Sequence, residues 1–265
     1  MNIFFREIKR YRKSLLFWSI GLVLLIASSM AKFSVYENNS DALSDLLSKM
    51  PQSIQSVFGL TGFDLTTAAG FYGVTFLYIA LMVSVHAVLM GANIIAKEER
   101  DRTSEFLFVK PVSRFKILSS KILAGLLEVL AINAVTFVSS VLVVDAFNNG
   151  PSINDDISTL NAGLLIMQFI FFFAGTAVAA ISRRPKASAS IATSILLVTF
   201  IAHYFVNMSA DLDWIKYFTP FKYFDAHNLI SGGGIELVYV VLSAIIIGIS
   251  VSLTYYSYNK RDLAV

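Results

Sequence analysis

The chain has 265 residues, of which 56% are hydrophobic and 15% charged, and its mean hydropathy is +0.68. Because an average soluble domain carries about 25% charged residues, too few polar side chains remain here to cover a water-facing surface. The absence of cysteine excludes a disulfide framework, a thiolate metal site and a cysteine nucleophile, and three histidines leave little for metal chemistry, so we predict no metal site.

Residues 1–14 have the pattern of an amphipathic helix. Phe4, Ile8 and Tyr11 recur at spacings of four and three residues, and basic side chains, including Arg10, occupy the rest of the segment. A cationic helix of this kind can lie in the lipid headgroup layer with its rings buried. We therefore predict an interfacial elbow helix that turns into the first span. The alternative is a basic flank that only sets membrane topology.

Six stretches approach or exceed the roughly 20 apolar residues that a helix needs to cross a bilayer core of about 30 Å. The predicted spans are residues 15–31, 71–96, 117–144, 160–181, 187–207 and 235–258. The predicted fold is therefore an all-α polytopic membrane protein with six transmembrane helices in a single transmembrane domain, residues 1–265. Small residues at 174–180 and 187–192 would permit close helix contacts.

Lysine and arginine fall mainly on one side of the predicted spans. Of the 21 basic residues, 17 lie near the N-terminus, around the connection between spans two and three, between spans four and five, or after span six. The other four are Lys32, Lys49, Lys216 and Lys222. Because cytoplasmic flanks retain positive charge during insertion, both termini are predicted to be cytoplasmic. Basic residues at the ends of spans fit membrane topology better than nucleic acid as a partner.

The segment between the first two spans is long. Residues 42–60 carry leucine and other apolar side chains at mostly helical spacing, interrupted by Pro51. This pattern predicts a helix on the outer membrane surface.

The inner loop, residues 97–116, is the most informative segment. Charges of both signs alternate up to Glu105, an apolar run follows at 106–109, and Pro111 interrupts the chain. Proline would end a short helix at or before residue 110, and Ser113 can cap the helix that re-enters the membrane. A purely topological loop needs only a few basic residues, so this mixture predicts docking to a cytoplasmic protein. The alternative is a solvated charged hairpin.

Ionisable side chains are few within the predicted spans, where they are costly. His86 and Glu128 each lie about ten residues from the inner end of their span, which at 1.5 Å per residue places both at a depth of about 15 Å. An adjacent antiparallel pair of spans would let them exchange a hydrogen bond or a proton. The alternative is a structural role between helices.

Residues 214–224, before the last span, are rich in aromatic side chains, and glycines at 232–234 then break the chain. Pro220, Phe221 and Tyr223 lie in this segment, which we predict to form a short hairpin that dips into the outer leaflet. The alternative is an ordinary aromatic belt at the membrane interface.

In their order along the chain, these segments resemble the permease subunits of ABC-2 type transporters. The likeness covers nearly the whole chain: the basic elbow, the outer segment with Met50-Pro51, the six spans, and Thr219–Asp225 before the last span. In the inner loop, acids are followed by Thr103, an apolar stretch and Pro-Val-Ser-Arg at 111–114, and Lys121 follows in the next span. Family members often have glycine where this chain has Arg102.

The resemblance implies a half-transporter, in which two permeases, identical or paralogous, pair and each docks a cytoplasmic ABC ATPase subunit. It assigns ATPase coupling to Glu98, Glu99, Arg100, Thr103, Glu105, Phe106, Pro111 and Arg114. It also implies that the outer hairpin forms a gate. The sequence contains no G-x-x-x-x-G-K-[ST] loop, so the chain itself is not expected to be an enzyme, and ATP and Mg would be bound by the partner.

Export and a bacterial plasma membrane follow from the resemblance and from the small, cysteine-free half-transporter. The alternative function is an ATPase-independent secondary transporter or channel that uses Glu128 and His86. Its weakness is the absence of matching interrupted helices in repeated halves of the chain. An intramembrane enzyme is disfavoured, because the sequence has neither H-E-x-x-H nor a G-x-S-x-G context.

Overall fold

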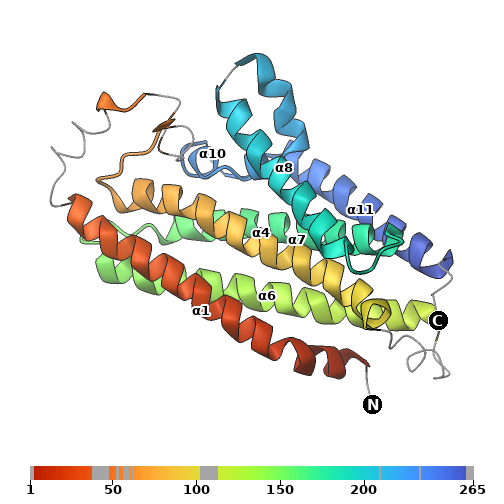
Figure 1. Cartoon of the computed structure of the whole chain (residues 1–265). Helices are drawn as coiled ribbons and strands as arrows, with labels where there is room; N and C mark the ends of the chain where they lie inside the picture. Colours follow the sequence, from red (N-terminus) through yellow and green to blue (C-terminus); the bar gives the residue numbers. More distant parts are fainter. Residues whose placement is uncertain are drawn as a thin grey trace.

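The computed structural model describes residues 3–37, 48–51, 54–55, 60, 62–101, 113–208, 210–232 and 234–260. Within these residues the chain forms six long α-helices and no strand. The long helices are α1 (Ile3–Glu37), α4 (Ala68–Arg100), α6 (Arg114–Phe147), α7 (Asn154–Ile181), α8 (Ser188–Met208) and α11 (Leu237–Lys260). All six are long and apolar enough to cross a membrane, which confirms the all-α polytopic fold (Figure 1).

Three short elements connect α8 to α11. A 3-10 helix, η1 (Ala210–Phe218), follows α8, and the short helices α9 (Pro220–Tyr223) and α10 (Ala226–Ser231) come next. We call residues 210–232, which these elements make up, the hairpin; that it dips into the outer leaflet stays a prediction.

The long helices correspond one to one to the predicted spans, and several extend well beyond them. With 33 residues at 1.5 Å each, α4 is about 50 Å long, against about 30 Å for the hydrocarbon core. The predicted inner loop is therefore too long: Lys97–Arg100 are the last turn of α4, and α6 already begins at Arg114. Hydropathy identifies only the part of a helix that lies in the hydrocarbon core. It does not identify the polar turns that extend the helix beyond the membrane.

Side-chain caps fix where two of these helices begin. The hydroxyl of Thr67 accepts a hydrogen bond from the Gly70 amide at the start of α4. Ser113 accepts one from the Lys116 amide at the start of α6, which confirms the predicted cap. Each cap satisfies an amide that has no partner inside its helix.

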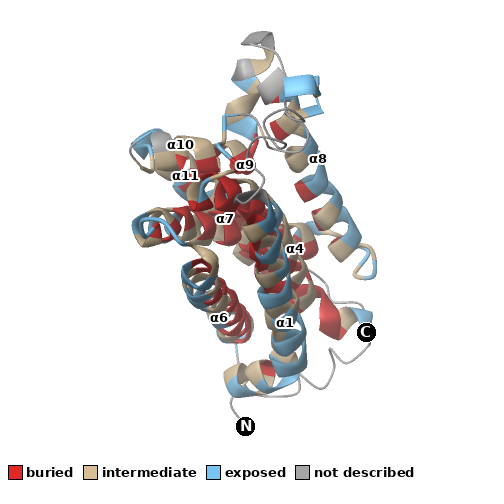
Figure 2. Ribbon diagram, turned by 90° about the vertical axis from the view of Figure 1, so that its left-hand side faces the viewer, coloured by how far each residue is buried: buried red, intermediate tan, exposed pale blue. Residues whose placement is uncertain are grey.

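The predicted elbow is continuous with the first span, because α1 is one helix from Ile3 to Glu37. Figures 1 and 2 show its first turns at an angle to the rest of the helix. Phe4, Ile8 and Tyr11 are partly buried against the core, whereas Arg10 is exposed. The apolar and basic sides predicted for this segment are thus present in the folded chain.

Helices α4 and α7 form the centre of the bundle and approach each other closely. A Cβ at Gly91 would overlap the carbonyl oxygen of Phe172, and a Cβ at Gly175 would overlap that of Val88. Figure 2 shows buried residues on these two helices, while α1 and α8 present exposed faces. Glycine on both helices therefore lets backbone meet backbone, as expected for small residues between membrane helices.

Hydrogen bonds show which helix ends lie together. Arg10, near the start of α1, donates to Asp101 just after α4, and Arg114, at the start of α6, donates to the carbonyl of Asn259 near the end of α11. We call this the basic end of the bundle. The opposite end holds the start of α4 and the hairpin, including its Thr219, whose hydroxyl donates to the carbonyl of Thr199 near the middle of α8.

Candidate functional site

Four charged side chains from three helices are buried together at the basic end. Glu7 of α1 pairs with Lys97 of α4, and Glu98 of α4 pairs with Lys121 of α6. Lys97 and Lys121 are only 1% and 0% exposed, and lysine is almost never buried so deeply unless it is paired. We call Glu7, Lys97, Glu98 and Lys121 the charge network.

Further contacts join the two ion pairs to each other. Lys97 Nζ lies 3.9 Å from Glu98 Oε1, and the Arg6 guanidinium lies 3.2 Å from Glu7 and 3.8 Å from Glu98. Lys97 Nζ also lies 4.8 Å from the centre of the Tyr11 ring, within cation–π range. The network therefore connects the first turns of α1, the last turn of α4 and an early turn of α6.

The network contains two negative and two positive charges. Burial of an unpaired charge is so costly that removing one partner of a buried pair typically destabilises a protein by about 3–5 kcal/mol. The pairs therefore resist separation, and they hold α1, α4 and α6 together at this end. The arrangement provides a mechanical link between helices, not a reactive group open to a substrate.

An exposed set of charges lies beside the network. Asp101 accepts hydrogen bonds from Arg100 at 3.2 Å and from Arg10 at 3.0 Å, and Arg100 also donates to Asn93 at 2.8 Å. The hydrogen bond from Arg100 is the main reason that the pKa of Asp101 lies below its usual value. Since exposed ion pairs contribute only about 0–1 kcal/mol, these contacts orient the chain where it leaves α4 but stabilise it little.

The predicted coupling residues that the structure describes differ in their solvent exposure. Glu98 is buried within the charge network, Glu99 is half-buried, and Arg100 is exposed. Arg114 is half-buried and bonded to α11. The other predicted coupling residues, Thr103, Glu105, Phe106 and Pro111, lie outside the described residues. The Glu98 carboxylate is thus engaged within its own chain.

Three members of the network, Glu7, Lys97 and Lys121, were not among the predicted site residues. Two of them, Glu7 and Lys121, stand at unusual positions in the sequence. Glu7 is the only acidic residue among the first 36 and stands among basic ones, and Lys121 falls inside a predicted span, where lysine is costly. The sequence alone could not identify their partners, because residues 7, 98 and 121 lie far apart along the chain.

His86 and Glu128 are both buried, at 3% and 4% exposure, but the structure does not bring them together. In the described part of the chain, no hydrogen bond or ion pair joins them. The His86 ring instead packs edge-on against Trp18 of α1, with ring centres 5.4 Å apart. Within the spans, the polar contacts of α6 include Asn133, which donates to Gln168 of α7 at 3.1 Å.

The predicted hairpin residues anchor the segment to the bundle. Pro220 begins α9, where its fixed φ suits a first helical position, and it is buried together with Phe221 and Tyr223. The Tyr223 ring stacks on Tyr239 of α11 with centres 5.0 Å apart, and its hydroxyl donates to the carbonyl of Tyr217. These contacts tie α9 to α11 and to η1.

The chain was compared with known protein families. The chain matches the family described as ABC-2 family transporter protein over residues 1–263, a stretch that includes all six long helices and the charge network. No curated protein matches the chain. Among the described residues, no group of three His, Cys, Asp or Glu side chains is placed to hold a metal ion.

Proposed function

The chain belongs to the ABC-2 transporter family, and from this membership we propose that it is a permease subunit that exports a substrate with energy from a separate cytoplasmic ABC ATPase. ATP and Mg would be bound by that partner, since this sequence has no phosphate-binding loop of its own. In this proposal the basic end, with both chain termini, faces the cytoplasm of a bacterial plasma membrane. That orientation agrees with the distribution of lysine and arginine.

The observation that carries the proposal is the charge network. Glu98 and Lys121 lie on either side of the connection between α4 and α6, which is the predicted docking segment, and they form an ion pair with each other. Lys97 then links the same turn of α4 to Glu7 of α1. Movement of the docking segment would therefore be passed to three membrane helices at once.

The coupling residues take two roles in this mechanism. The exposed Arg100, with the described part of the segment around it, would meet the ATPase. The buried Glu98 would not touch the ATPase but would transmit its movement, because separating the Glu98–Lys121 pair inside the protein is costly. The first turns of α1 would move with them, since Glu7 is held by Lys97.

The transport path is proposed to require a second permease copy or a paralogue. Large apolar side chains such as Phe17, Ile195 and Val198 are exposed on α1 and α8. In a membrane such faces are covered by lipid or by another helix bundle. Lipid would cover the apolar faces that the second permease leaves exposed. In this arrangement the exposed Phe5 of the elbow would lie where the lipid headgroups and acyl chains meet.

The first test is to purify the tagged chain from its native membrane in mild detergent, and to measure subunit stoichiometry and ATPase activity. We expect a cytoplasmic ATPase to be recovered at about one copy per permease. Recovery of the chain alone, without ATPase activity, would contradict the proposal.

A second test addresses coupling. Glu7→Gln should leave the ATPase bound but reduce the effect of the permease on the ATPase rate, because Lys97 loses its partner on α1. Lys9→Gln, an exposed position on the same helix, is the matched control and should behave as the wild type. If Glu7→Gln affected the ATPase rate as the wild type does, the charge network would not take part in coupling.

The alternative, a secondary transporter or channel, depends on Glu128 and His86. We expect Glu128→Gln to leave transport intact, since the structure shows no hydrogen bond or ion pair between the two residues in its described part. Loss of transport in Glu128→Gln with the ATPase still stimulated would favour ion coupling instead.

A further inference from the structure

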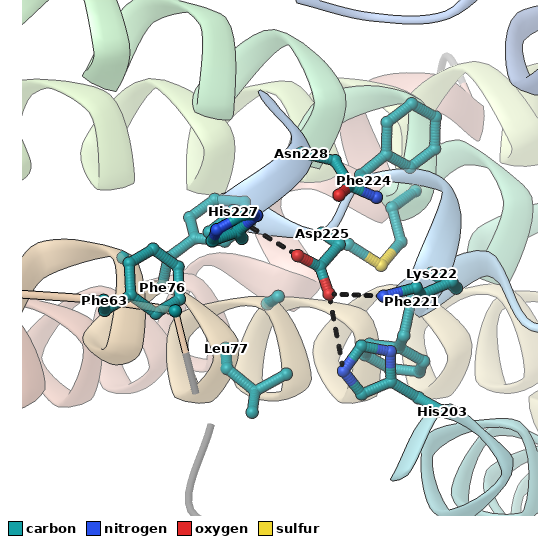
Figure 3. Close-up of a pocket in the computed structure, with 15 residues that line it drawn as sticks. Phe63, Phe76, Leu77, His203, Phe221, Lys222, Phe224, Asp225, His227 and Asn228 are labelled. Carbon is teal, nitrogen blue, oxygen red and sulfur yellow. Dashed lines mark hydrogen bonds and ion pairs between the residues drawn. The ribbon is translucent and has the colours of Figure 1, made fainter. Parts of the chain in front are cut away.

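A cavity of about 260 Å³ lies at the opposite end of the bundle, between α4, α7, α8 and the hairpin (Figure 3). Its walls are mostly aromatic and aliphatic and include Phe63, Phe76, Leu77, Met167, Phe221 and Phe224. An apolar cavity of about 150 Å³ accepts benzene. The cavity therefore has room for one ring with a short side arm.

One side of the cavity is polar and is organised around Asp225. Its Oδ1 accepts the His227 amide at 3.0 Å, and its Oδ2 lies 3.3 Å from Lys222 Nζ and 3.9 Å from His203 Nε2. Figure 3 shows these groups converging on the carboxylate from α8, α9 and α10. Asp225, the one acidic residue of the lining, is thus already surrounded by donors.

The remaining polar groups of the lining favour a ligand that accepts hydrogen bonds. Lys222 can only donate, whereas the His227 ring and the Asn228 amide can each donate or accept. Lysine also supplies a positive charge at the boundary between the polar side and the aromatic walls. A cationic ligand would have to displace Lys222 from Asp225, whereas an anion can accept from Lys222 without breaking that pair when it approaches Nζ on the side away from Asp225.

The segment before α4 holds the His227 ring in place. Gly62 has a positive φ of 84°, and a Cβ there would lie 2.7 Å from Cδ2 of His227. The Phe63 ring meets the imidazole edge-on, with centres 5.7 Å apart. The polar side is therefore pre-formed by packing between parts of the chain that are distant in sequence.

We infer that this cavity is a binding site for a small amphiphilic carboxylate, an acid that carries a single ring or a short alkyl chain. The apolar body would lie against Phe76 and Phe221, and the carboxylate would accept hydrogen bonds from Lys222 and His227. The site lies within one chain, so the inference depends neither on the direction of transport nor on an ATPase.

The three histidines of the chain provide the test, because two line the cavity, whereas His86 of α4 packs against Trp18 of α1. Histidine NMR signals of the isotope-labelled full-length protein in lipid nanodiscs are followed during titration with 3-phenylpropionate. Saturable shifts of His203 and His227, assigned with His203→Gln and His227→Gln, together with an unmoved His86 signal, would support the site. Absence of any shift, or equal and unsaturable shifts of all three signals, would overturn it.

A matched pair of variants locates the probe. Ala80→Leu fills the cavity from α4 and leaves its polar groups in place, so we expect at least tenfold weaker binding. Ala134→Leu makes the same change at an exposed position of α6 and should leave affinity unchanged. Unchanged affinity in a folded Ala80→Leu would place the probe elsewhere. The titration of the wild type decides the question if that variant does not fold.

A second ligand tests the charge. 3-Phenylpropan-1-ol has the same ring and chain length but no negative charge, and we expect it to bind at least tenfold more weakly than 3-phenylpropionate. Equal affinity for the two compounds would overturn the assignment of an anion.

Discussion

The two ends of the bundle are held together in different ways. At the basic end, buried ion pairs fasten α1, α4 and α6 through Glu7, Lys97, Glu98 and Lys121. At the opposite end, aromatic side chains and one carboxylate, Asp225, surround a cavity. Buried ion pairs fix geometry because their separation is costly, whereas apolar surfaces can repack with a smaller loss. The basic end is therefore suited to transmit movement, and the opposite end to adapt to a ligand.

The largest effect is expected at the centre of the charge network. Lys121→Met would leave the buried Glu98 without its nearest partner, so we expect a loss of about 3–5 kcal/mol in the free energy of unfolding. The measurement is the unfolding midpoint of the purified protein in detergent. If this variant proved as stable as the wild type, the proposed difference between the two ends would not hold.

Two companion variants separate loss of the pair from general damage. Lys116→Met removes an exposed lysine from the preceding turn of α6 and should change stability by less than about 0.5 kcal/mol. The double variant Glu98→Gln with Lys121→Met should be more stable than Lys121→Met alone, because no unpaired carboxylate remains.

A smaller effect is expected at the opposite end. Asp225→Asn removes the charge that Lys222 faces, but the Lys222 side chain is 18% exposed and can turn to water. We expect a loss of about 1.5–3 kcal/mol, the range for hydrogen bonds to charged groups. Asp145→Asn, at an exposed position of α6, serves as the control. A loss as large as that of Lys121→Met would mean that both ends are fastened equally.

The smallest effect is expected on the exposed side of the basic end. Arg10→Gln removes one hydrogen bond to Asp101 and should cost about 0.2–1 kcal/mol at pH 7. The folded-state pKa of Asp101 is lowered, so its contribution is fully present above the unfolded-state pKa of about 3.9 and is lost as pH falls through the folded value.

The difference in unfolding midpoint between Arg10→Gln and the wild type should therefore shrink as the pH is lowered towards 3, and also in high salt. Arg12→Gln, exposed on the same helix, is the control. A difference that persists at low pH and high salt would show that Arg10 stabilises α1 by packing and not through Asp101.

Much of the secondary structure was predictable, because the bilayer imposes length and hydropathy on each span. The Ser113 cap also followed from local chemistry and is present. The continuity of α1 through the elbow and the extension of α4 to Arg100 were not predicted, because charged residues at the ends of spans look alike in loops and in helices. Among the site residues, Glu98 was predicted in the inner loop, whereas it lies in the last turn of α4 and is buried.

The sequence by itself determined the solvent in which this chain folds, the number of its long helices and, through the order of its segments, its resemblance to ABC-2 permeases. These features are recorded in local composition and spacing. Only the tertiary structure decided that Lys121 meets Glu98 and that His203 lies near Asp225, whereas His86 faces Trp18 and is not bonded to Glu128. Such pairings depend on how each helix is rotated about its axis, and that rotation is set by close contacts between distant segments, such as those of Gly91 and Gly175.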